Sequence, residues 1–241
     1  MKILKVLGIT IGAMLIVAAL VVGYLGFLPG VSNVFGSNQP KDLGVTYSES
    51  DYQSAHARNG TTHTVLPGGS IPEHSIQFSG QHPVDTTYTQ SEFNALLNYR
   101  QWQYYPLKQC QLKINPDGTL EFSGVVIISR IKGYMQALGV SENSLKTITG
   151  YLKYIHGNAA FYAKGRFEII NGQIINTELT NFKVGNLNLT NQVKNKLSSI
   201  ISGVYSQMDA YPGFTVKTLT FNNGQVQFEG TLPDSARSVN K

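Results

Sequence analysis

Cysteine is nearly missing from the chain, which has only Cys110 among its 241 residues. A single cysteine cannot form a disulfide within the chain, so the sequence excludes a small secreted module held together by disulfide bonds. In the stretch LKQCQLKI, Cys110 alternates in phase with Leu112 and Ile114. This phase predicts a buried strand position, where cysteine behaves as a small hydrophobic residue.

Charge is also scarce, because Asp, Glu, Lys and Arg together make up 14% of the residues. The formal net charge is only +5, and the basic residues are scattered along the chain. Proteins that bind nucleic acid concentrate positive charge on one surface, so we expect no nucleic-acid partner. Hydrophobic residues make up 41% of the chain, which is enough to build a folded core.

The sequence lacks the motifs that carry common catalytic chemistry. It has no G-x-S-x-G nucleophile motif and no glycine loop for phosphate or dinucleotide binding. The five histidines match no metal-binding spacing. Two carboxylates, Glu121 and Glu229, fall in predicted strands, and we interpret both as solvent-facing residues rather than as a glycosidase pair. We therefore expect no catalytic residue, no metal site, no cofactor and no enzymatic activity.

One long hydrophobic run is present near the N-terminus. Residues 6–28 contain no charged residue; Lys2 and Lys5 precede them, and the next basic residue is Lys41. A helix of about 20 apolar residues crosses a bilayer, and the positive-inside rule places its N-terminus in the cytoplasm. We therefore expect residues 1–28 to form a cytoplasmic stub and a retained single-pass anchor in the cell membrane. A cleaved signal peptide is the alternative, although its apolar region runs only about 7 to 15 residues.

The rest of the chain divides by composition. Residues 29–43 are rich in glycine, proline, serine and asparagine, which is typical of a spacer. Residues 44–86 follow as an N-terminal extension of helix and loop with one short strand, and residues 87–233 form the main extracytoplasmic domain. Residues 234–241 are a polar tail that we expect to fray.

Two segments, TYSESDYQSA and TYTQSEFNAL, share a pattern that opens helices. In each, a hydroxyl residue precedes an acidic residue by three positions: Ser48 precedes Asp51, and Thr89 precedes Glu92. This is the spacing of a capping box, in which hydroxyl and carboxylate each accept from a backbone N–H of the first turn. We expect a short helix after each capping pair.

Two later stretches have helical periodicity. The first covers residues 129–156 and is interrupted at Gly139. The second, LTNQVKNKLSSIISGVYSQMDAYPG, is the clearest helix of the sequence and has a cap at Thr190 or Asn191. Its apolar stripe consists of Val193, Leu197, Ile200, Ile201, Val204 and Met208. The stripe either packs into a solid core or lines an apolar groove for an acyl chain.

Tight-turn signals divide the remaining sequence into hairpins. Two of them nearly repeat each other, as INPDGTLEFSG and FNNGQVQFEG. In both, the turn glycine is followed four residues later by a phenylalanine, Phe122 or Phe228, that we expect to face inward. The polar residues differ between the copies, so the repeat indicates scaffold rather than a catalytic motif. The glycine that closes each copy is expected to permit a bulge or bend.

Together these elements predict an α+β fold. We expect an N-terminal transmembrane helix followed by one domain, in which antiparallel β-hairpins form a curved sheet packed on amphipathic helices. The residues that would face an apolar ligand are Val193, Leu197, Ile200, Ile201, Val204, Met208, Phe122 and Phe228.

Several of these segments, taken together, resemble a known group of proteins. They are the anchor, TQSEFNALLN, INPDGTLEFSG, GRFEIINGQIINTELTNFKVGNLNL, the capped helix and VKTLTFNNGQVQFEGT. The combination, over about Thr87 to Leu232, resembles membrane-anchored extracytoplasmic bacterial proteins of unknown function. These are distantly similar to the tubular lipid-binding (TULIP-like) superfamily. The resemblance implies a long helix wrapped by a curved antiparallel sheet, and it implies no catalytic residue.

We therefore expect a membrane-tethered extracytoplasmic domain that binds a lipid or another apolar molecule of the cell envelope. The alternative is a structural or interaction protein that scaffolds an envelope complex, with a protein partner, a solid core and no small ligand.

Overall fold

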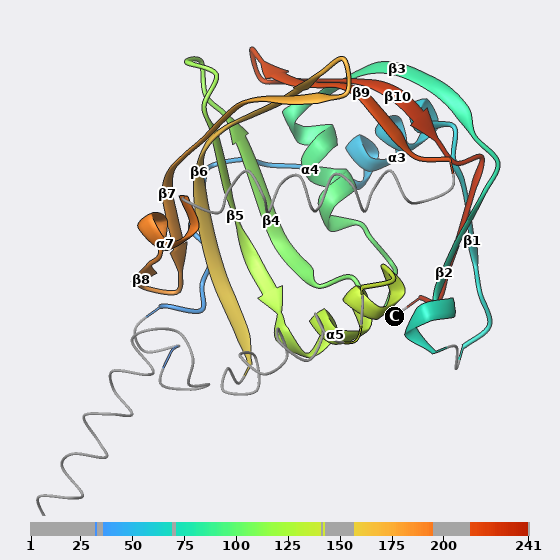
Figure 1. Cartoon of the computed structure of the whole chain (residues 1–241), viewed down its shortest axis with the longest axis horizontal. Coiled ribbons are helices and arrows are strands. Elements are labelled where there is room, and N and C mark those ends of the chain that lie inside the picture. The colour runs from blue at the N-terminus through green and yellow to red at the C-terminus, as the bar shows by residue number, and fades with distance from the viewer. Residues whose placement is uncertain are drawn as a thin grey trace, which may run out of the picture.

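In the computed structural model, the described residues are 32, 36–68, 71–140, 142, 157–194 and 213–240. They form an α+β fold with mostly antiparallel strands, which confirms the fold class expected from the sequence. A large curved sheet bends around two helices, and a smaller sheet stands beside it (Figure 1). None of the helices in the described ranges is both long and apolar enough to span a bilayer. The anchor predicted over residues 1–28 lies outside those ranges.

The large sheet has eight strands. Six follow one another in the order β3 (His82–Thr89), β10 (Gln225–Leu232), β9 (Thr215–Asn222), β6 (Asn158–Ile170), β5 (Leu120–Ile127) and β4 (Leu107–Ile114). The remaining two are β7 (Gln173–Val184), which pairs with β6, and β8 (Leu187–Asn188), which pairs with β7. Strand β6 therefore joins the two halves of the sheet, because it pairs with β5 over its first part and with β9 near its end.

Bulges bend the sheet where the sequence supplies glycine. The register of β9 and β10 shifts between Glu229 and Gly230, as expected for the glycine that closes the second repeat. In the first repeat the register of β4 and β5 shifts between Lys108 and Gln111, opposite the corresponding Gly124, and a Cβ on this glycine would lie 3.0 Å from the Cys110 Sγ. The closing glycine therefore lies at a bulge in both copies, and in the first copy it also permits close packing against Cys110.

The predicted hairpin turns are present. Asn171 and Gly172 have φ values of 53° and 71°, and Asn223 and Gly224 have 49° and 72°. Two consecutive residues with positive φ make the type I′ turn, whose twist matches that of paired strands, and asparagine followed by glycine tolerates this geometry best. These Asn-Gly turns explain why both hairpins could be predicted from the sequence.

Both predicted capping boxes are also formed. Ser48 caps α3 (Glu49–Asn59) together with Asp51, and Thr89 caps α4 (Gln90–Asn98) together with Glu92. The helical period expected after residue 128 appears as α5 (Ile128–Ala137). The period expected after residue 189 begins as α7 (Thr190–Lys194). Most of what was predicted beyond these two helices lies outside the described residues.

Helix α4 covers the free edge of β4 through a ladder of side-chain amides. The pairs are Gln90 with Ile114, Asn94 with Leu112, and Asn98 with Cys110. The Asn94 amide donates to the Leu112 carbonyl at 2.8 Å and accepts from the Leu112 N–H at 2.6 Å. Four residues of helix rise about 6.0 Å and two residues of strand about 6.8 Å, so the two elements stay in step. The edge of β4 is thereby protected from pairing with another chain.

The prediction for the C-terminal residues was wrong, because most of them belong to the small sheet. Its order is β1 (Thr62–Val65), β11 (Ser235–Ser238) and β2 (Ile76–Ser79), with the 3₁₀ helix η1 (Pro72–His74) before β2. Residues 234–241 were expected to fray, but β11 is the central strand, because it finds backbone partners on both sides. The expected boundary at residue 87 also falls inside β3, so residues 44–86 are continuous with the fold.

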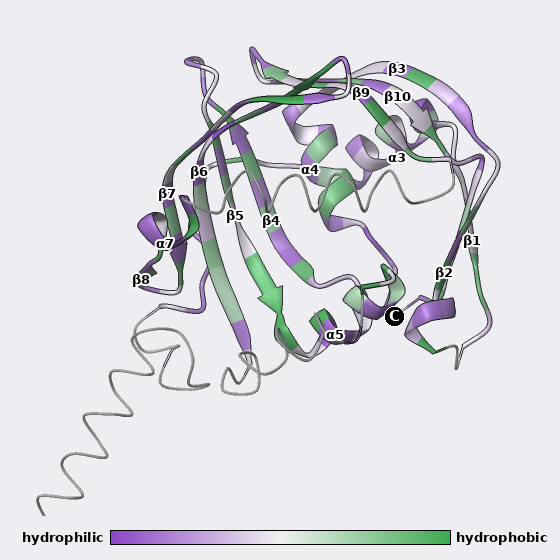
Figure 2. Cartoon of the chain, in the orientation of Figure 1, coloured by the Kyte–Doolittle hydropathy of each residue, from purple (hydrophilic) through white to green (hydrophobic). Residues whose placement is uncertain are grey.

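The core lies between α4 and the inner face of the large sheet. Cys110 is fully buried, as predicted, and burial raises the pKa of its thiol to about 12. Phe93 on α4 meets Phe221 on β9 edge to face, with ring centroids 6.3 Å apart. Figure 2 shows hydrophobic and hydrophilic residues interleaved along most strands, which is the pattern of sheets with one buried face.

Candidate functional site

A cavity of about 530 Å³ lies where the small sheet, the end of α4 and α5 meet. Figure 1 shows the end of the chain in this region, between α5 and the small sheet. The described lining residues are Tyr52, His63, Thr64, Val65, Ile76, Phe78, Leu97, Tyr99, Arg100, Gln101, Trp102, Tyr105, Tyr134, Leu138, Phe214, Pro233, Ala236, Ser238 and Asn240. None of these described residues is acidic, and seven of them are aromatic. We call this cavity the aromatic pocket.

The rings of the aromatic pocket belong to two groups. On one side, Tyr99 lies 5.5 Å from Tyr52, measured between ring centroids. On the other side, Trp102 lies 5.5 Å from Tyr134. Rings held against each other in tilted or edge-to-face geometry keep their orientation without a ligand, so both walls are already formed.

Trp102 is fixed by contacts from distant parts of the chain. Its indole N–H donates to the Ser75 hydroxyl at 3.1 Å, in a buried position. Its backbone forms an isolated bridge with Asn240, and the next amide, that of Gln103, donates to the Val239 carbonyl at 2.9 Å. The residues after β11 therefore position one wall of the pocket.

Charge in the described lining is confined to one guanidinium and one imidazole. The Arg100 Nε donates to the Leu96 carbonyl at 3.0 Å, which holds the side chain against the last turn of α4. His63 is open to solvent on one side, but packing on the pocket side and the nearby His56 and Arg100 lower its pKa to about 4. The imidazole is therefore neutral at pH 7, and Arg100 carries the positive charge.

Two tyrosines of the pocket stay protonated over the whole physiological range. Burial raises the pKa of Tyr105 and of Tyr134 above that of a free phenol. Their hydroxyls therefore act as neutral hydrogen-bonding groups and add no negative charge to the pocket.

The residues predicted to face a ligand lie elsewhere. Phe228 is 8% exposed and belongs to the core, and Phe122 packs against the same core with its ring 5.0 Å from Phe161. Val193 is half-buried in α7. The other predicted residues, Leu197, Ile200, Ile201, Val204 and Met208, lie outside the described part of the chain. None of the three described candidates is among the lining residues of the aromatic pocket.

Sequence reasoning missed the aromatic pocket, although one signal was present. The stretch YRQWQYY at residues 99–105 places four aromatic residues between α4 and β4. Because this connecting segment belongs to neither a helix nor a strand, it offers no regular face of its own on which these aromatic side chains could pack. A cluster of this kind indicates either packing against a distant segment or a binding surface, and the sequence does not say which.

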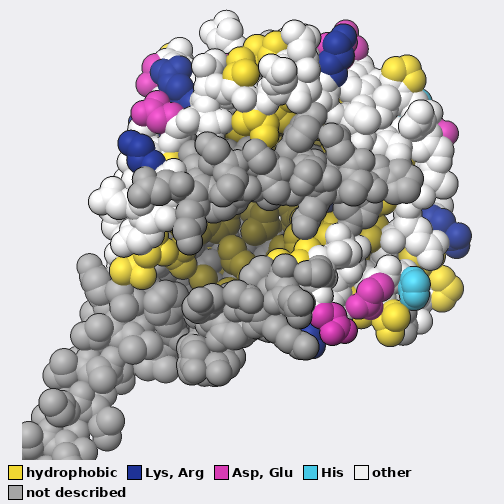
Figure 3. Space-filling model, viewed as in Figure 1, with side chains coloured by type: hydrophobic (Ala, Val, Ile, Leu, Met, Phe, Trp, Pro, Cys, Tyr) yellow, Lys and Arg dark blue, Asp and Glu magenta, His cyan; other side chains and the backbone are white. Residues whose placement is uncertain are grey.

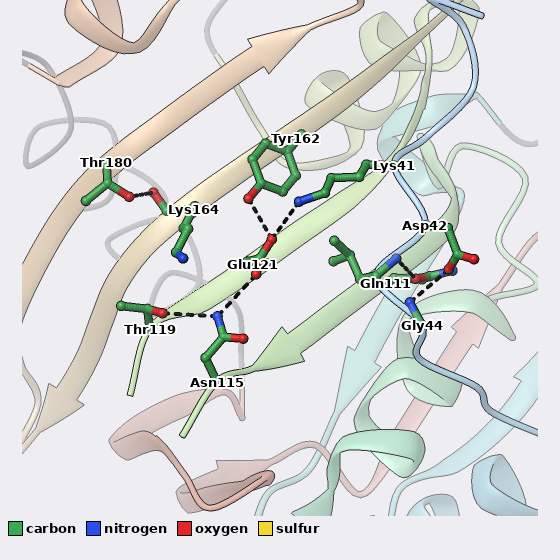
Figure 4. Close-up of polar contacts among 11 residues, drawn as sticks. Lys41, Asp42, Gly44, Gln111, Asn115, Thr119, Glu121, Tyr162, Lys164 and Thr180 are labelled. Carbon is green, nitrogen blue, oxygen red and sulfur yellow. Dashed lines mark hydrogen bonds and ion pairs between the residues drawn. The ribbon is translucent and has the colours of Figure 1, made fainter. Parts of the chain in front are cut away.

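A polar cluster, separate from the aromatic pocket, lies on the outer face of the large sheet (Figure 4). Glu121 on β5 accepts from Lys41 at 2.9 Å and from the Tyr162 hydroxyl at 2.6 Å. Its other oxygen accepts from the amide of Asn115 at 3.3 Å. Hydrogen bonds from Tyr162 and Lys41 lower the pKa of Glu121 to about 2. A carboxylate that is ionised and satisfied in this way is poorly suited to exchange protons near pH 7.

The same cluster fixes the segment that precedes the domain. Lys41 lies over the ring of Tyr162, 4.2 Å from its centroid, and the Leu43 N–H donates to Gln111 at 2.6 Å. Residues 41–45, which we call the strap, thus cross from β6 and β5 to β4. Leu43 and Val45, which belong to the strap, are both buried.

Glu229, the other carboxylate in a predicted strand, has its own cationic partner. Glu229 on β10 accepts from Lys217 at 2.6 Å and from Thr218 at 3.1 Å. Glu229 and Glu121 therefore lie on different strands and pair with different cations, Lys217 and Lys41. Among the described residues, no three side chains of His, Cys, Asp or Glu come together as metal ligands would.

The comparisons with known proteins give no relative for this arrangement. No model of a protein family matches the chain, and no curated protein and no solved structure shows a significant match. The resemblance to the tubular lipid-binding superfamily therefore stays a prediction.

Proposed function

We propose that the chain is a membrane-tethered extracytoplasmic binding domain that takes an apolar small molecule into the aromatic pocket. The observation that carries this proposal is a cavity of about 530 Å³ lined by seven aromatic residues with no described carboxylate. Ligand sites in proteins are commonly cavities of roughly 300 to 1,000 Å³ with apolar, aromatic walls and a few polar groups. The aromatic pocket has this size and composition.

The size of the cavity indicates how much binding energy is attainable. At roughly 30 Å³ per molecule, a cavity of this volume holds on the order of eighteen waters. A ten-carbon chain that enters the pocket gains roughly 8 kcal/mol, at about 0.8 kcal/mol for each buried CH₂. Ordering the ligand costs part of this gain. An apolar ligand of this length is therefore expected to bind in the micromolar range or more weakly.

The tether is supported by the apolar run of residues 6–28 and by the strap. In the proposal the run anchors the chain, and the strap attaches the following residues to the outer face of the sheet through Lys41 and Glu121. Residues 29–40, most of the predicted spacer, connect the run to the strap. The domain is thereby kept close to the bilayer, which is a source of apolar molecules.

A scaffold without a ligand is the second candidate function. It is favoured by the core, where Phe122 and Phe228 pack with the residues of α4 rather than facing a groove. Two large hydrophobic side chains, Val65 and Ile71, are 63% and 57% exposed near the small sheet. Exposed apolar side chains of this kind are also found where proteins contact each other.

Photo-crosslinking distinguishes the two candidates. The full chain would be expressed in membranes, treated with a fatty acid that carries a diazirine on its chain, irradiated and mapped by peptide mass spectrometry. We expect adducts in the segment 99–105 and at Tyr134. Adducts confined to residues 6–28 would mean that the probe reached the chain only from the bilayer, and the proposal would fail.

A pocket-filling variant provides the control. Val65 lines the pocket and is largely exposed, so Val65→Trp adds volume at the pocket without overpacking the core. We expect this variant to lose the adducts in the segment 99–105. Ile71→Trp, which enlarges an exposed side chain outside the lining, should keep them.

A further inference from the structure

We propose that His82 makes ligand binding in the aromatic pocket depend on pH, so that the pocket binds its ligand more tightly below neutral pH than above it. This regulation rests on the function proposed above and adds a control to it. It is carried by two hydrogen bonds of the His82 ring that exist together only when the ring is charged.

Both ring nitrogens of His82 face an oxygen that accepts hydrogen bonds. Nε2 lies 2.7 Å from the backbone carbonyl oxygen of Asn59, and Nδ1 lies 2.9 Å from a carboxylate oxygen of Asp234. A neutral imidazole carries one N–H, whereas the charged ring carries two. Both bonds are therefore formed only when His82 is protonated. A neutral ring loses one of them and turns a lone pair toward an acceptor.

The two bonds join separate parts of the fold. Asn59 ends α3, His82 begins β3, and Asp234 lies between β10 of the large sheet and β11 of the small sheet. The backbone carbonyl of Asp234 also accepts from the N–H of Thr62, the first residue of β1, at 2.9 Å. The charged ring of His82 therefore lies where the small sheet is attached to the large one.

The parts joined by His82 carry walls of the aromatic pocket. Tyr52 of α3 lines the pocket, and so do Pro233 and Ala236 on either side of Asp234. On the face shown in Figure 3, hydrophobic side chains gather in the hollow and charged ones lie toward the rim. When His82 is charged, α3 and the β10–β11 connection are held at one point, so these walls keep their spacing before a ligand arrives. A site that is already ordered binds more tightly, because less ordering is required on binding.

The charged groups around His82 come from the elements packed on it. Asp234 contacts the ring from the β10–β11 connection. On α3, Arg58 forms an ion pair with Glu92 of α4, which balances its charge. On β3 itself, Asp85 lies three residues from His82, so alternation along the strand directs it to the opposite face. Among the described residues, Asp234 is therefore the charge that acts directly on the ring.

The direction of the effect follows from the protonation of the ring. The Asn59 carbonyl and, next to it, the Asp234 carboxylate raise the pKa of His82 above its ordinary value of 6.5. The ring is therefore charged at pH 5.5, and it loses its second proton as the pH rises through the higher folded pKa. His63, the histidine of the described lining, has a pKa lowered to about 4 and stays neutral throughout. The state that binds more tightly is the acidic one.

Dodecanol is a suitable probe, because its hydroxyl group does not change charge between pH 5.5 and 8.5. Trp102 is the only tryptophan of the chain and lines the pocket, so its fluorescence reports binding. The full chain in phosphatidylcholine vesicles would be titrated with dodecanol at both pH values. We expect half-saturation at pH 8.5 to require roughly three to ten times more dodecanol, the range that corresponds to one lost hydrogen bond.

Two variants are expected to lose the pH dependence in opposite ways. In Asp234→Asn, the new amide can accept from the Nδ1–H of a charged ring or donate to the bare Nδ1 of a neutral ring. This variant should bind dodecanol at both pH values about as the original chain does at pH 5.5. In His82→Gln the side chain is uncharged throughout. This variant should bind at both pH values about as the original chain does at pH 8.5.

His74→Gln is the matched control. His74 is exposed on η1 and is not among the described lining residues. The variant removes an imidazole elsewhere and should keep the full pH dependence.

Two results would overturn the proposed regulation. One is equal binding of dodecanol by the original chain at pH 5.5 and 8.5; the other is a pH dependence that persists in Asp234→Asn. In both cases the apolar pocket stands and only its control by His82 is wrong. If His82→Gln fails to fold by circular dichroism, the original chain and Asp234→Asn still decide. If dodecanol changes Trp102 fluorescence at neither pH, the proposed function itself fails.

Discussion

Asn94 and Leu112 hydrogen-bond to each other twice, so that a side chain on a helix takes the place of a neighbouring strand. Asn94 is fully buried, and its amide supplies one donor and one acceptor, as a backbone peptide group would. The interaction joins α4 to the edge of β4 at the centre of the ladder.

Replacing Asn94 with leucine should be strongly destabilising. Leucine has a similar volume but leaves the N–H and the carbonyl of Leu112 buried without partners. At about 1 to 3 kcal/mol for each of these two unpaired groups, Asn94→Leu is expected to lower the free energy of unfolding by about 2 to 6 kcal/mol. Urea denaturation measures this change. Gln53→Leu, an amide replacement at an exposed position of α3, is the control and should change stability little.

His82 should make stability depend on pH near neutrality. The carbonyl of Asn59 and the carboxylate of Asp234 lie 2.7 and 2.9 Å from its two ring nitrogens, and they raise its pKa above the ordinary value of 6.5. A raised pKa means that the charged form stabilises the folded state. This contribution is complete below pH 6.5 and is lost as the pH rises through the higher folded pKa.

The measurement is urea denaturation of the chain at a series of pH values from 5.5 to 8.5. We expect this part of the stability to decrease toward the alkaline end, and Asp234→Asn to flatten the decrease. His74→Gln, at an exposed position on η1, is the control and should leave the slope unchanged. A slope that Asp234→Asn does not alter would contradict the assignment to His82.

Removing the charge of Glu121 should release the strap. Glu121→Gln weakens the bonds to Lys41 and Tyr162, and for a side chain that is 13% exposed the cost is about 1 to 3 kcal/mol. Hydrogen exchange should then rise at Leu43 and Val45. Glu229→Gln breaks an exposed ion pair on another strand and should leave these amides protected.

The same carboxylate predicts a loss of stability in acid. The lowered pKa of Glu121, about 2, means that its ionised form stabilises the folded state. The contribution is complete above the unfolded pKa of about 4.3 and disappears as the pH falls toward 2. In the Glu121→Gln variant this part of the acid dependence should be missing, and unchanged acid sensitivity would count against the assignment.

A proline in β11 should open the small sheet. Arg237 pairs with Thr64 of β1 on one side and Gln77 of β2 on the other. Proline removes the backbone donor from this central strand, so Arg237→Pro is expected to cost about 1 to 3 kcal/mol from the unpaired acceptor. Hydrogen exchange in β1 and β2 and the fluorescence of Trp102 should both change. Arg237→Gln at the same position tests whether loss of the side chain alone has this effect.

The sequence predicted those features that depend on a few consecutive residues. Ser48 with Asp51, and Asn171 with Gly172, act within one turn, so their meaning does not depend on the rest of the chain. The amide ladder was missed because Asn94 gains its role from Leu112, which lies on a different element. Residues 235–238 were predicted to fray for the same reason, because their role depends on partners on other strands. Those partners are more than 150 residues away.

The aromatic pocket lay beyond prediction because it is assembled from separated segments. Tyr52, Trp102, Tyr134 and Phe214 approach one another only when the small sheet stands against α4 and α5. The hydrophobic pattern of the sequence marks residues as apolar without saying whether they fill a core or border a cavity. Phe228 and Phe214 show this, because one is buried in the core and the other reaches the pocket.

The pairing of β3 with β10 also bears on the order of folding. These strands are joined from Thr89 and Gln225 to His82 and Leu232, across more than 130 residues of chain. Strand β11 then completes the small sheet with β1 and β2. Because contacts between distant residues form slowly, the sheets cannot close until the latest-synthesised of the described strands are available. The two sheets are therefore expected to close only after β10 and β11 have been synthesised, and the earlier strands depend until then on whatever keeps them from aggregating.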